Sequence, residues 1–93
     1  MIKYQLQYSK TFVKQLKKLP KDLQKLVYQK LDLLTSDPSH PSLRTKINNS
    51  WSHDLDEKVY ECSINMNYRI IFCYRENTVI LLLAVGTHDI VDR

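Results

Sequence analysis

The chain has 93 residues, a length typical of one small domain, so we expect residues 1–93 to form a single domain. Its 14 lysine and arginine residues outnumber its 10 aspartate and glutamate residues, and the net charge of +4 favours a polyanion or an acidic protein as partner. No run of about 18 apolar residues occurs, which excludes a membrane-spanning helix.

The same composition limits the compartment and the chemistry. The first ten residues lack the apolar core of a secretory signal peptide. Both cysteines fall within strand-like segments, which is typical of buried, reduced thiols rather than of a disulfide framework. We therefore expect a cytoplasmic protein. The single glycine excludes a glycine-rich phosphate-binding loop.

The N-terminal third predicts one strand followed by two helices. Residues 2–8 alternate weakly and predict an edge or second strand. Ser9 is a suitable N-cap for a helix that ends near Leu19, and Pro20 starts a second helix that runs to about Thr35. Each helix carries an apolar stripe, so the pair is expected to cover one face of a sheet.

This third of the chain is also its most basic part. Its lysines are Lys3, Lys10, Lys14, Lys17, Lys18, Lys21, Lys25 and Lys30. They either contact the phosphates of a nucleic acid or form an ordinary solvated helix face, and the sequence leaves both interpretations open.

The middle of the chain contains few apolar residues. Residues 36–42 are a loop by composition, and residues 43–48 predict a short strand. Residues 49–57 are polar except for Trp51 and Leu55, which predicts a connection without regular structure.

Two alternating segments, residues 59–65 and 68–75, predict a β-hairpin with a turn at Met66 and Asn67. A three-residue loop would place Asn65 opposite Arg69. This register keeps the apolar and polar side chains on separate faces, whereas a slip of one residue would mix them. The polar face would carry Glu61, Ser63, Asn65 and Arg69.

A nearly unbroken apolar run, residues 79–85, predicts a central strand buried on both sides. Gly86 ends the run, and His88 and Asp89 follow at the end of the strand. The complete order is β-α-α-β-β-β-β. This order predicts an α+β fold in which a mainly antiparallel sheet carries the two N-terminal helices on one face.

Three of these residues suggest acid–base and electrostatic chemistry. Arg69 can bind a phosphate through two parallel hydrogen bonds, or it can form a salt bridge with Glu61. His88, adjacent to Asp89, can act as a general acid or base near neutral pH. Glu61 is the complementary base or, alternatively, orients Arg69.

Metal and cofactor sites are not predicted. His40, His53 and His88 lack ligand spacing, and there is no Cys-x-x-Cys motif. RNA cleavage fits these limits, because the 2′-hydroxyl of the substrate attacks the adjacent phosphate and the protein supplies a base, an acid and a cation.

The sequence as a whole resembles the RelE/ParE superfamily of toxins from type II toxin–antitoxin systems. The resemblance spans nearly the whole chain and depends on residues 43–44, 68–72 and 85–89 together with the element order. Within this superfamily, the sequence is most similar to the RelE, YafQ and YoeB type of mRNA interferase. In the YafQ pattern a histidine takes the place of Ser63 and an aspartate that of Asn67.

The resemblance implies a metal-independent endoribonuclease, without a cofactor, that cleaves mRNA, often on the ribosome. Arg69 would bind the phosphate, His88 would protonate the leaving group, and Glu61 would be the candidate base. The further substrate-binding residues would be Arg44, Lys46, Ser63, Asn65, Asn67, Asp89 and Arg93. A cognate antitoxin would bind the toxin in a hetero-oligomer, with no membrane partner.

The chain also departs from the RelE type. The strand that contains Glu61 lacks the catalytic lysines, and Asp92 stands near the position of an aromatic residue expected about four positions after His88. Two alternatives therefore stay open. One is a ParE-like toxin that inhibits DNA gyrase without cleaving RNA, and the other is a non-catalytic binding protein with the toxin fold.

Overall fold

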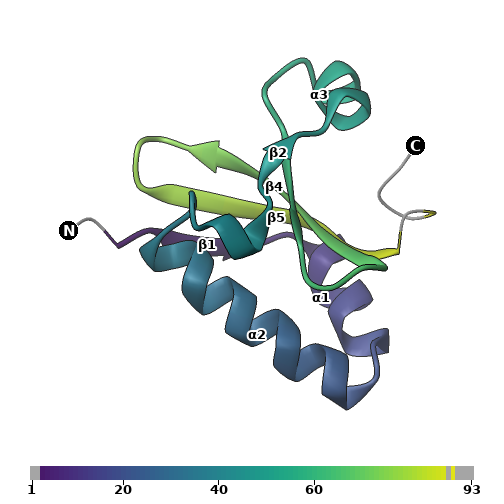
Figure 1. The fold of residues 1–93 in the computed structure, drawn as a ribbon. Helices are drawn as coiled ribbons and strands as arrows, with labels where there is room; N and C mark the ends of the chain where they lie inside the picture. Colours follow the sequence, from purple (N-terminus) through teal and green to yellow (C-terminus); the bar gives the residue numbers. More distant parts are fainter. Residues whose placement is uncertain (1–2, 88, 90–93) are drawn as a thin grey trace.

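A computed structural model of the chain describes residues 3–87 and residue 89. Its elements follow in chain order, coloured from purple to yellow in Figure 1. They are β1 (Gln5–Tyr8), α1 (Lys10–Lys18), α2 (Lys21–Ser36), the 3-10 helix η1 (Pro41–Leu43), β2 (Lys46–Ile47), α3 (Asn49–Leu55), β3 (Tyr60–Ser63), β4 (Tyr68–Arg75) and β5 (Val79–Thr87).

The strands form one sheet in the order β1-β5-β4-β3-β2. β1 pairs with β5 in parallel, and the other neighbours are antiparallel. The expected α+β fold with a mainly antiparallel sheet is confirmed. The apolar run predicted as a central strand is β5, which lies between β1 and β4.

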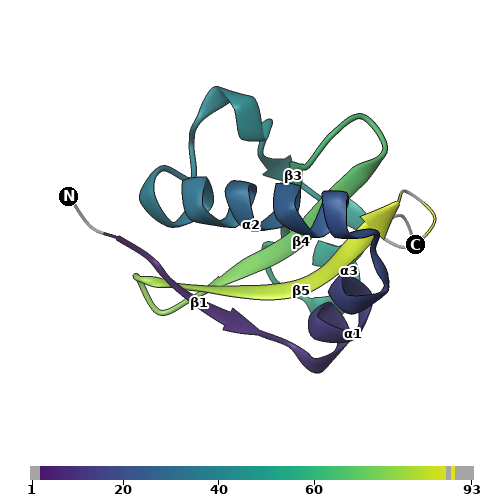
Figure 2. The ribbon, with the colours of Figure 1, turned by 90° about the horizontal axis from the view of Figure 1, so that it is seen from below.

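Helices α1 and α2 begin where the sequence predicts. The Ser9 side chain accepts a hydrogen bond from the Phe12 backbone N–H, and Pro20 precedes α2. Figure 2 shows α2 lying across one face of the sheet. The apolar stripes of α1 and α2 pack against the sheet and form the main core. Its buried members are Phe12, Leu16, Val27, Leu31, Leu34, Leu43, Cys62, Ile64, Ile70, Phe72, Ile80, Leu82 and Val85.

The opposite face carries a helix that the sequence analysis missed. Residues 49–57 were expected to be an irregular connection, but they contain α3, which lies on the other side of the sheet from α2 (Figure 1). Asn48 caps its first turn, and Asp56 ends it with a left-handed φ of 53°. Trp51 anchors it on a second cluster, formed with Val59, Ile71, Cys73 and Ala84.

The β3–β4 hairpin has a different register from the predicted one. Arg69 pairs with Ser63 rather than with Asn65. The cause is the Asn65 side chain, whose Oδ1 accepts hydrogen bonds of 2.9 Å from the backbone N–H groups of Asn67 and Tyr68 and so builds a longer turn. The shift is two residues, so each side chain stays on its predicted face.

The strand predicted for residues 43–48 is shorter in the structure. Leu43 belongs to η1, and β2 contains Lys46 and Ile47 alone. Arg44 between them has a left-handed φ of 49°, which cannot continue a strand. No helix in residues 3–87 is long and apolar enough to cross a membrane.

Candidate functional site

A polar network lies on the face of the sheet that carries α3, next to its small apolar cluster. The strand register places Lys46 beside Glu61 and Ser63 beside Arg69. Partners in antiparallel strands point to the same face. These four side chains therefore share one surface, as the alternation predicted for three of them.

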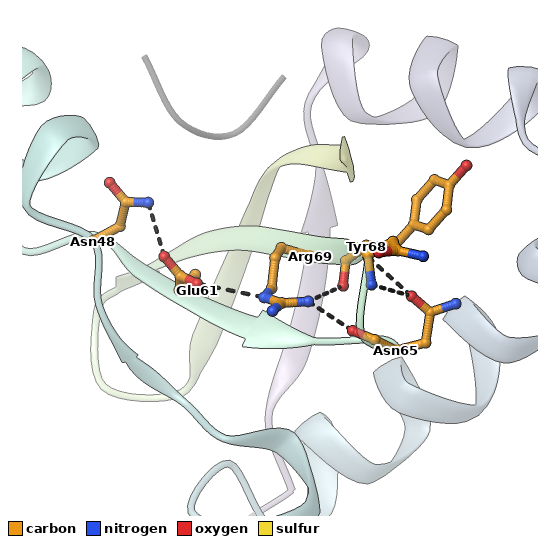
Figure 3. A network of polar contacts seen from close by, with 6 residues as sticks. Asn48, Glu61, Asn65, Tyr68 and Arg69 are labelled. Carbon is orange, nitrogen blue, oxygen red and sulfur yellow. Dashed lines mark hydrogen bonds and ion pairs between the residues drawn. The ribbon is translucent and has the colours of Figure 1, made fainter. Parts of the chain in front are cut away.

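Arg69 is held in a defined position. Its Nη1 donates hydrogen bonds to the backbone oxygens of Asn65 (2.6 Å) and Tyr68 (3.0 Å), as Figure 3 shows. Its Nε lies 3.7 Å from Oε2 of Glu61, and the side chain is 17% exposed. Gly86, the β5 partner of Arg69, has no side chain that could cover it. None of the described residues hydrogen-bonds to Nη2, which leaves donors for a ligand.

Glu61 is a buried carboxylate with partners for both oxygens. The residue is 7% exposed. Its Oε1 accepts a hydrogen bond of 3.0 Å from Nδ2 of Asn48, and its Oε2 faces Arg69 (Figure 3). A buried carboxyl group without partners would be costly, and these two contacts give both oxygens of Glu61 a partner inside the fold.

A surface pocket of about 200 Å³ opens beside this network. Its lining residues are Ser42, Arg44, Ser63, Ile64, Asn65, Met66 and Arg69. Four predicted site residues, Arg44, Ser63, Asn65 and Arg69, are therefore together. The pocket has two guanidinium groups and no carboxylate in its lining, so it is suited to an anion such as a phosphodiester.

The remaining predicted residues are more scattered. Asn67 and Asp89 line another pocket, of about 320 Å³, together with Tyr68 and Thr87. Lys46 is exposed next to Glu61 and does not line the arginine pocket. His88 and Arg93, the predicted acid and an additional cation, lie outside the described residues.

A second arginine on β4, Arg75, forms an exposed ion pair that can be compared with the buried contact of Arg69. Arg75 donates a hydrogen bond from Nη1 to Oε1 of Glu57 at the far end of the strand. This bond lowers the pKa of the Glu57 carboxyl group below its usual value, and it raises the pKa of Arg75. The pair lines neither of the two pockets described above.

Asn48 is the functional candidate that the sequence analysis missed. It is 5% exposed and joins α3 to Glu61. An asparagine before a helix is a capping signal. It was not recognised because residues 49–57 were predicted to have no regular structure. Among the described residues, no group of three His, Cys, Asp or Glu side chains could hold a metal ion.

Comparison with known proteins gives a family match over most of the chain. Residues 6–91 match the family described as the ParE toxin of the type II toxin–antitoxin system parDE. Among proteins of curated function, none matches the sequence.

Solved structures share the fold. The RelE of an archaeal RelE–RelB complex from Pyrococcus horikoshii is 20% identical with a TM-score of 0.73, and the alignment covers 92% of this chain and 96% of that one. A metal-bound toxin from Helicobacter pylori is 23% identical with a TM-score of 0.73 and the same coverages. YafQ from E. coli is 15% identical with a TM-score of 0.71, covering 92% and 94%. At these identities the likeness concerns the fold.

Proposed function

Because the chain belongs to the ParE toxin family of type II toxin–antitoxin systems, we propose that it acts as a metal-independent endoribonuclease that cleaves mRNA and so inhibits translation. The observation that carries this proposal is the pocket in which Arg44 and Arg69 converge beside Ser63 and Asn65. Two guanidinium groups over an open hollow favour a phosphodiester substrate.

In the proposed reaction the 2′-hydroxyl of the RNA attacks the neighbouring phosphorus atom. A new oxygen–phosphorus bond forms and the bond to the 5′-oxygen breaks, which leaves a cyclic phosphate on one fragment. Arg69, through its Nη2, and Arg44 bind the phosphate and stabilise its extra negative charge in the transition state. His88 gives its proton to the departing 5′-oxygen.

Glu61 has two proposed roles. As a general base it would take the proton of the 2′-hydroxyl, which requires it to give up the hydrogen bond to Asn48 or its contact with Arg69. As an orienting group it would keep both contacts, and the proton of the 2′-hydroxyl would then pass to a solvent water. The present geometry supports the orienting role, because both oxygens already have partners and the carboxylate is buried.

Variants at two arginines of the same strand test the proposal. We expect Arg69→Ala to reduce RNA cleavage and growth arrest about a hundredfold, as for the loss of a group that stabilises transition-state charge. Arg75→Ala is the matched control, because that side chain pairs with Glu57 away from the pocket, and it should keep full activity. His88→Ala should lose cleavage to a similar degree. The measurement is the mapping of mRNA 5′ ends after expression, together with purified protein on RNA.

The proposal fails if growth arrest is unchanged by Arg69→Ala and His88→Ala and no new 5′ ends appear. That result would favour a second candidate, a non-catalytic inhibitor of DNA gyrase. The observation in its favour is that the matching family is named for ParE rather than RelE. Its signature would be lost DNA supercoiling and DNA-damage signalling with intact mRNA.

The proposed partner is a cognate antitoxin, in a hetero-oligomer that forms in the cytoplasm. The RelE of Pyrococcus horikoshii was solved as a complex with RelB, which supports a protein partner of this kind. The exposed lysines of α1 and α2 suit an acidic antitoxin segment or ribosomal RNA. Co-expression with the product of a neighbouring reading frame should restore growth, and a lack of rescue would argue against it.

A further inference from the structure

Asn48 makes two contacts that point in different directions from one buried side chain. Its Oδ1 accepts a hydrogen bond of 2.9 Å from the backbone N–H of Trp51 and caps α3. Its Nδ2 donates to Oε1 of Glu61. The Trp51 contact fixes the amide orientation, because a backbone N–H can act only as a donor and must therefore face the amide oxygen.

The second contact continues to the proposed substrate pocket. Glu61 lies between Asn48 and Arg69, with one oxygen toward each (Figure 3). With one oxygen fixed by Asn48, the carboxylate can turn less, and its other oxygen stays beside Nε of Arg69. The guanidinium is then held from Nε and Nη1, while Nη2 has no hydrogen-bond partner among the described residues and Arg69 lines the pocket.

We propose that Asn48 is a positioning residue that, through Glu61, fixes the Arg69 guanidinium for binding an RNA phosphate. This inference builds on the proposed function. Phosphate binding then depends on the first turn of α3, a helix that itself contributes nothing to the lining of the pocket. Asn48 does not touch the RNA.

Asn48→Ser separates positioning from capping. Serine caps helices about as well as asparagine, so this variant keeps the hydrogen bond to Trp51 while it removes the amide that reaches Glu61. Asn77→Ser is the matched control, since Asn77 is exposed in the turn between β4 and β5. The probe is an oligoribonucleotide with 2′-O-methyl groups, which binds but cannot be cleaved.

We expect Asn48→Ser to weaken binding of this oligonucleotide about tenfold, while Asn77→Ser leaves it unchanged. In an Arg69→Ala background Asn48→Ser should have no further effect, because the position acts through that guanidinium. An equal tenfold loss in both backgrounds, or no loss in either, overturns the proposal. A merely structural role would produce the same loss with and without Arg69.

A second measurement does not need RNA. The Nε–H signal of Arg69 in a ¹⁵N NMR spectrum should move, and its hydrogen exchange should accelerate about tenfold, in Asn48→Ser and not in Asn77→Ser. An unchanged signal overturns the positioning role. If the wild type binds no RNA at all, the endoribonuclease proposal fails, and the NMR comparison alone decides the role of Asn48.

Discussion

The two faces of the sheet are built for different purposes. One face is covered by α1 and α2 over an extended apolar core. The other is covered by the short helix α3 over a small cluster, and beside that cluster it carries a buried carboxylate and an arginine pocket. The same strands therefore contribute most of the apolar packing on one side and most of the polar arrangement on the other.

Neighbouring residues of β4 show this division most directly. Ile70 belongs to the large core and Ile71 to the small cluster, and both are fully buried. Ile71 is also the register partner of Glu61. Two residues can therefore be equally buried and have different roles. The face of the strand on which a side chain lies decides whether it packs in the large core or next to the candidate site.

The largest effect on stability is expected from the large core under α1 and α2. Phe12→Ala removes a fully buried aromatic side chain, which should lower the free energy of unfolding by about 3–5 kcal/mol. Chemical denaturation measures this change. RNA affinity of the molecules that remain folded should be unchanged. A cost below about 1 kcal/mol would show that the large core does not dominate stability.

The helix caps on the two faces give a sharper test. Ser9→Ala and Asn48→Ala each remove a capping hydrogen bond, which should cost about 0.5–2 kcal/mol of stability. Each variant also removes a second hydrogen bond, from Ser9 to the Leu83 backbone oxygen or from Asn48 to Glu61. We expect the loss to be larger for Asn48→Ala, because the acceptor left without its donor is then a buried carboxylate rather than a backbone oxygen. Only the change at Asn48 should weaken RNA binding. Equal effects of both variants on RNA binding would remove the distinction between the faces.

Ile70→Val and Ile71→Val compare the faces with identical chemistry. Each variant should lower the free energy of unfolding by about 0.5–1.5 kcal/mol, since each removes one buried methylene. A small loss of RNA affinity is expected for Ile71→Val alone, and calorimetric titration with a non-cleavable oligonucleotide measures it. A loss of RNA affinity for Ile70→Val alone would place the site on the face covered by α1 and α2.

At neutral pH the two cysteines give the smallest effect, because their titration changes stability only in alkali. Burial raises the pKa of Cys62, in the large core, from 9.0 to about 12, and it also raises the pKa of Cys73, in the small cluster. A raised pKa in the folded state gives stability that is complete below about pH 9 and is lost as the pH rises toward the folded pKa.

Cys62→Val removes this titration. Between pH 9 and 12 the free energy of unfolding of wild type should fall faster than that of Cys62→Val, by up to about 1.4 kcal/mol per pH unit. Cys73→Val should also flatten the alkaline slope, because burial raises the pKa of that thiol as well. Denaturation curves at several pH values measure both slopes, and parallel curves for wild type and Cys62→Val would contradict the assignment.

The sequence predicted the faces of the hairpin correctly and its register wrongly. Alternation is a property of each strand, so it places Glu61 and Arg69 on one face without any knowledge of the turn. The register depends on how Asn65 uses its side chain, and a single asparagine is compatible with several turns. The family resemblance and the fold class, which depend on element order, were confirmed.

The residue types that line the candidate pocket were predicted from the sequence, and the contacts between them were not. Arg44 and Arg69 were chosen as phosphate ligands, and the structure brings them to one pocket. Asn48 was not chosen, because its contacts depend on α3, and two apolar residues in a polar stretch, Trp51 and Leu55, are too few to establish a helical period. Partners that meet across 13 residues of chain, as Asn48 and Glu61 do, become visible only when the fold is known.

The parallel pairing of β1 with β5 has a consequence for how the protein is made. Gln5 lies beside Val79, so the sheet cannot close until the strand at residues 79–87 has been synthesised. At about 5–20 residues per second, the growing chain spends several seconds with its apolar faces uncovered. Throughout that interval the nascent polypeptide lacks both pairings of β5, with β1 and with β4, and its apolar strand faces stay open to other polypeptides.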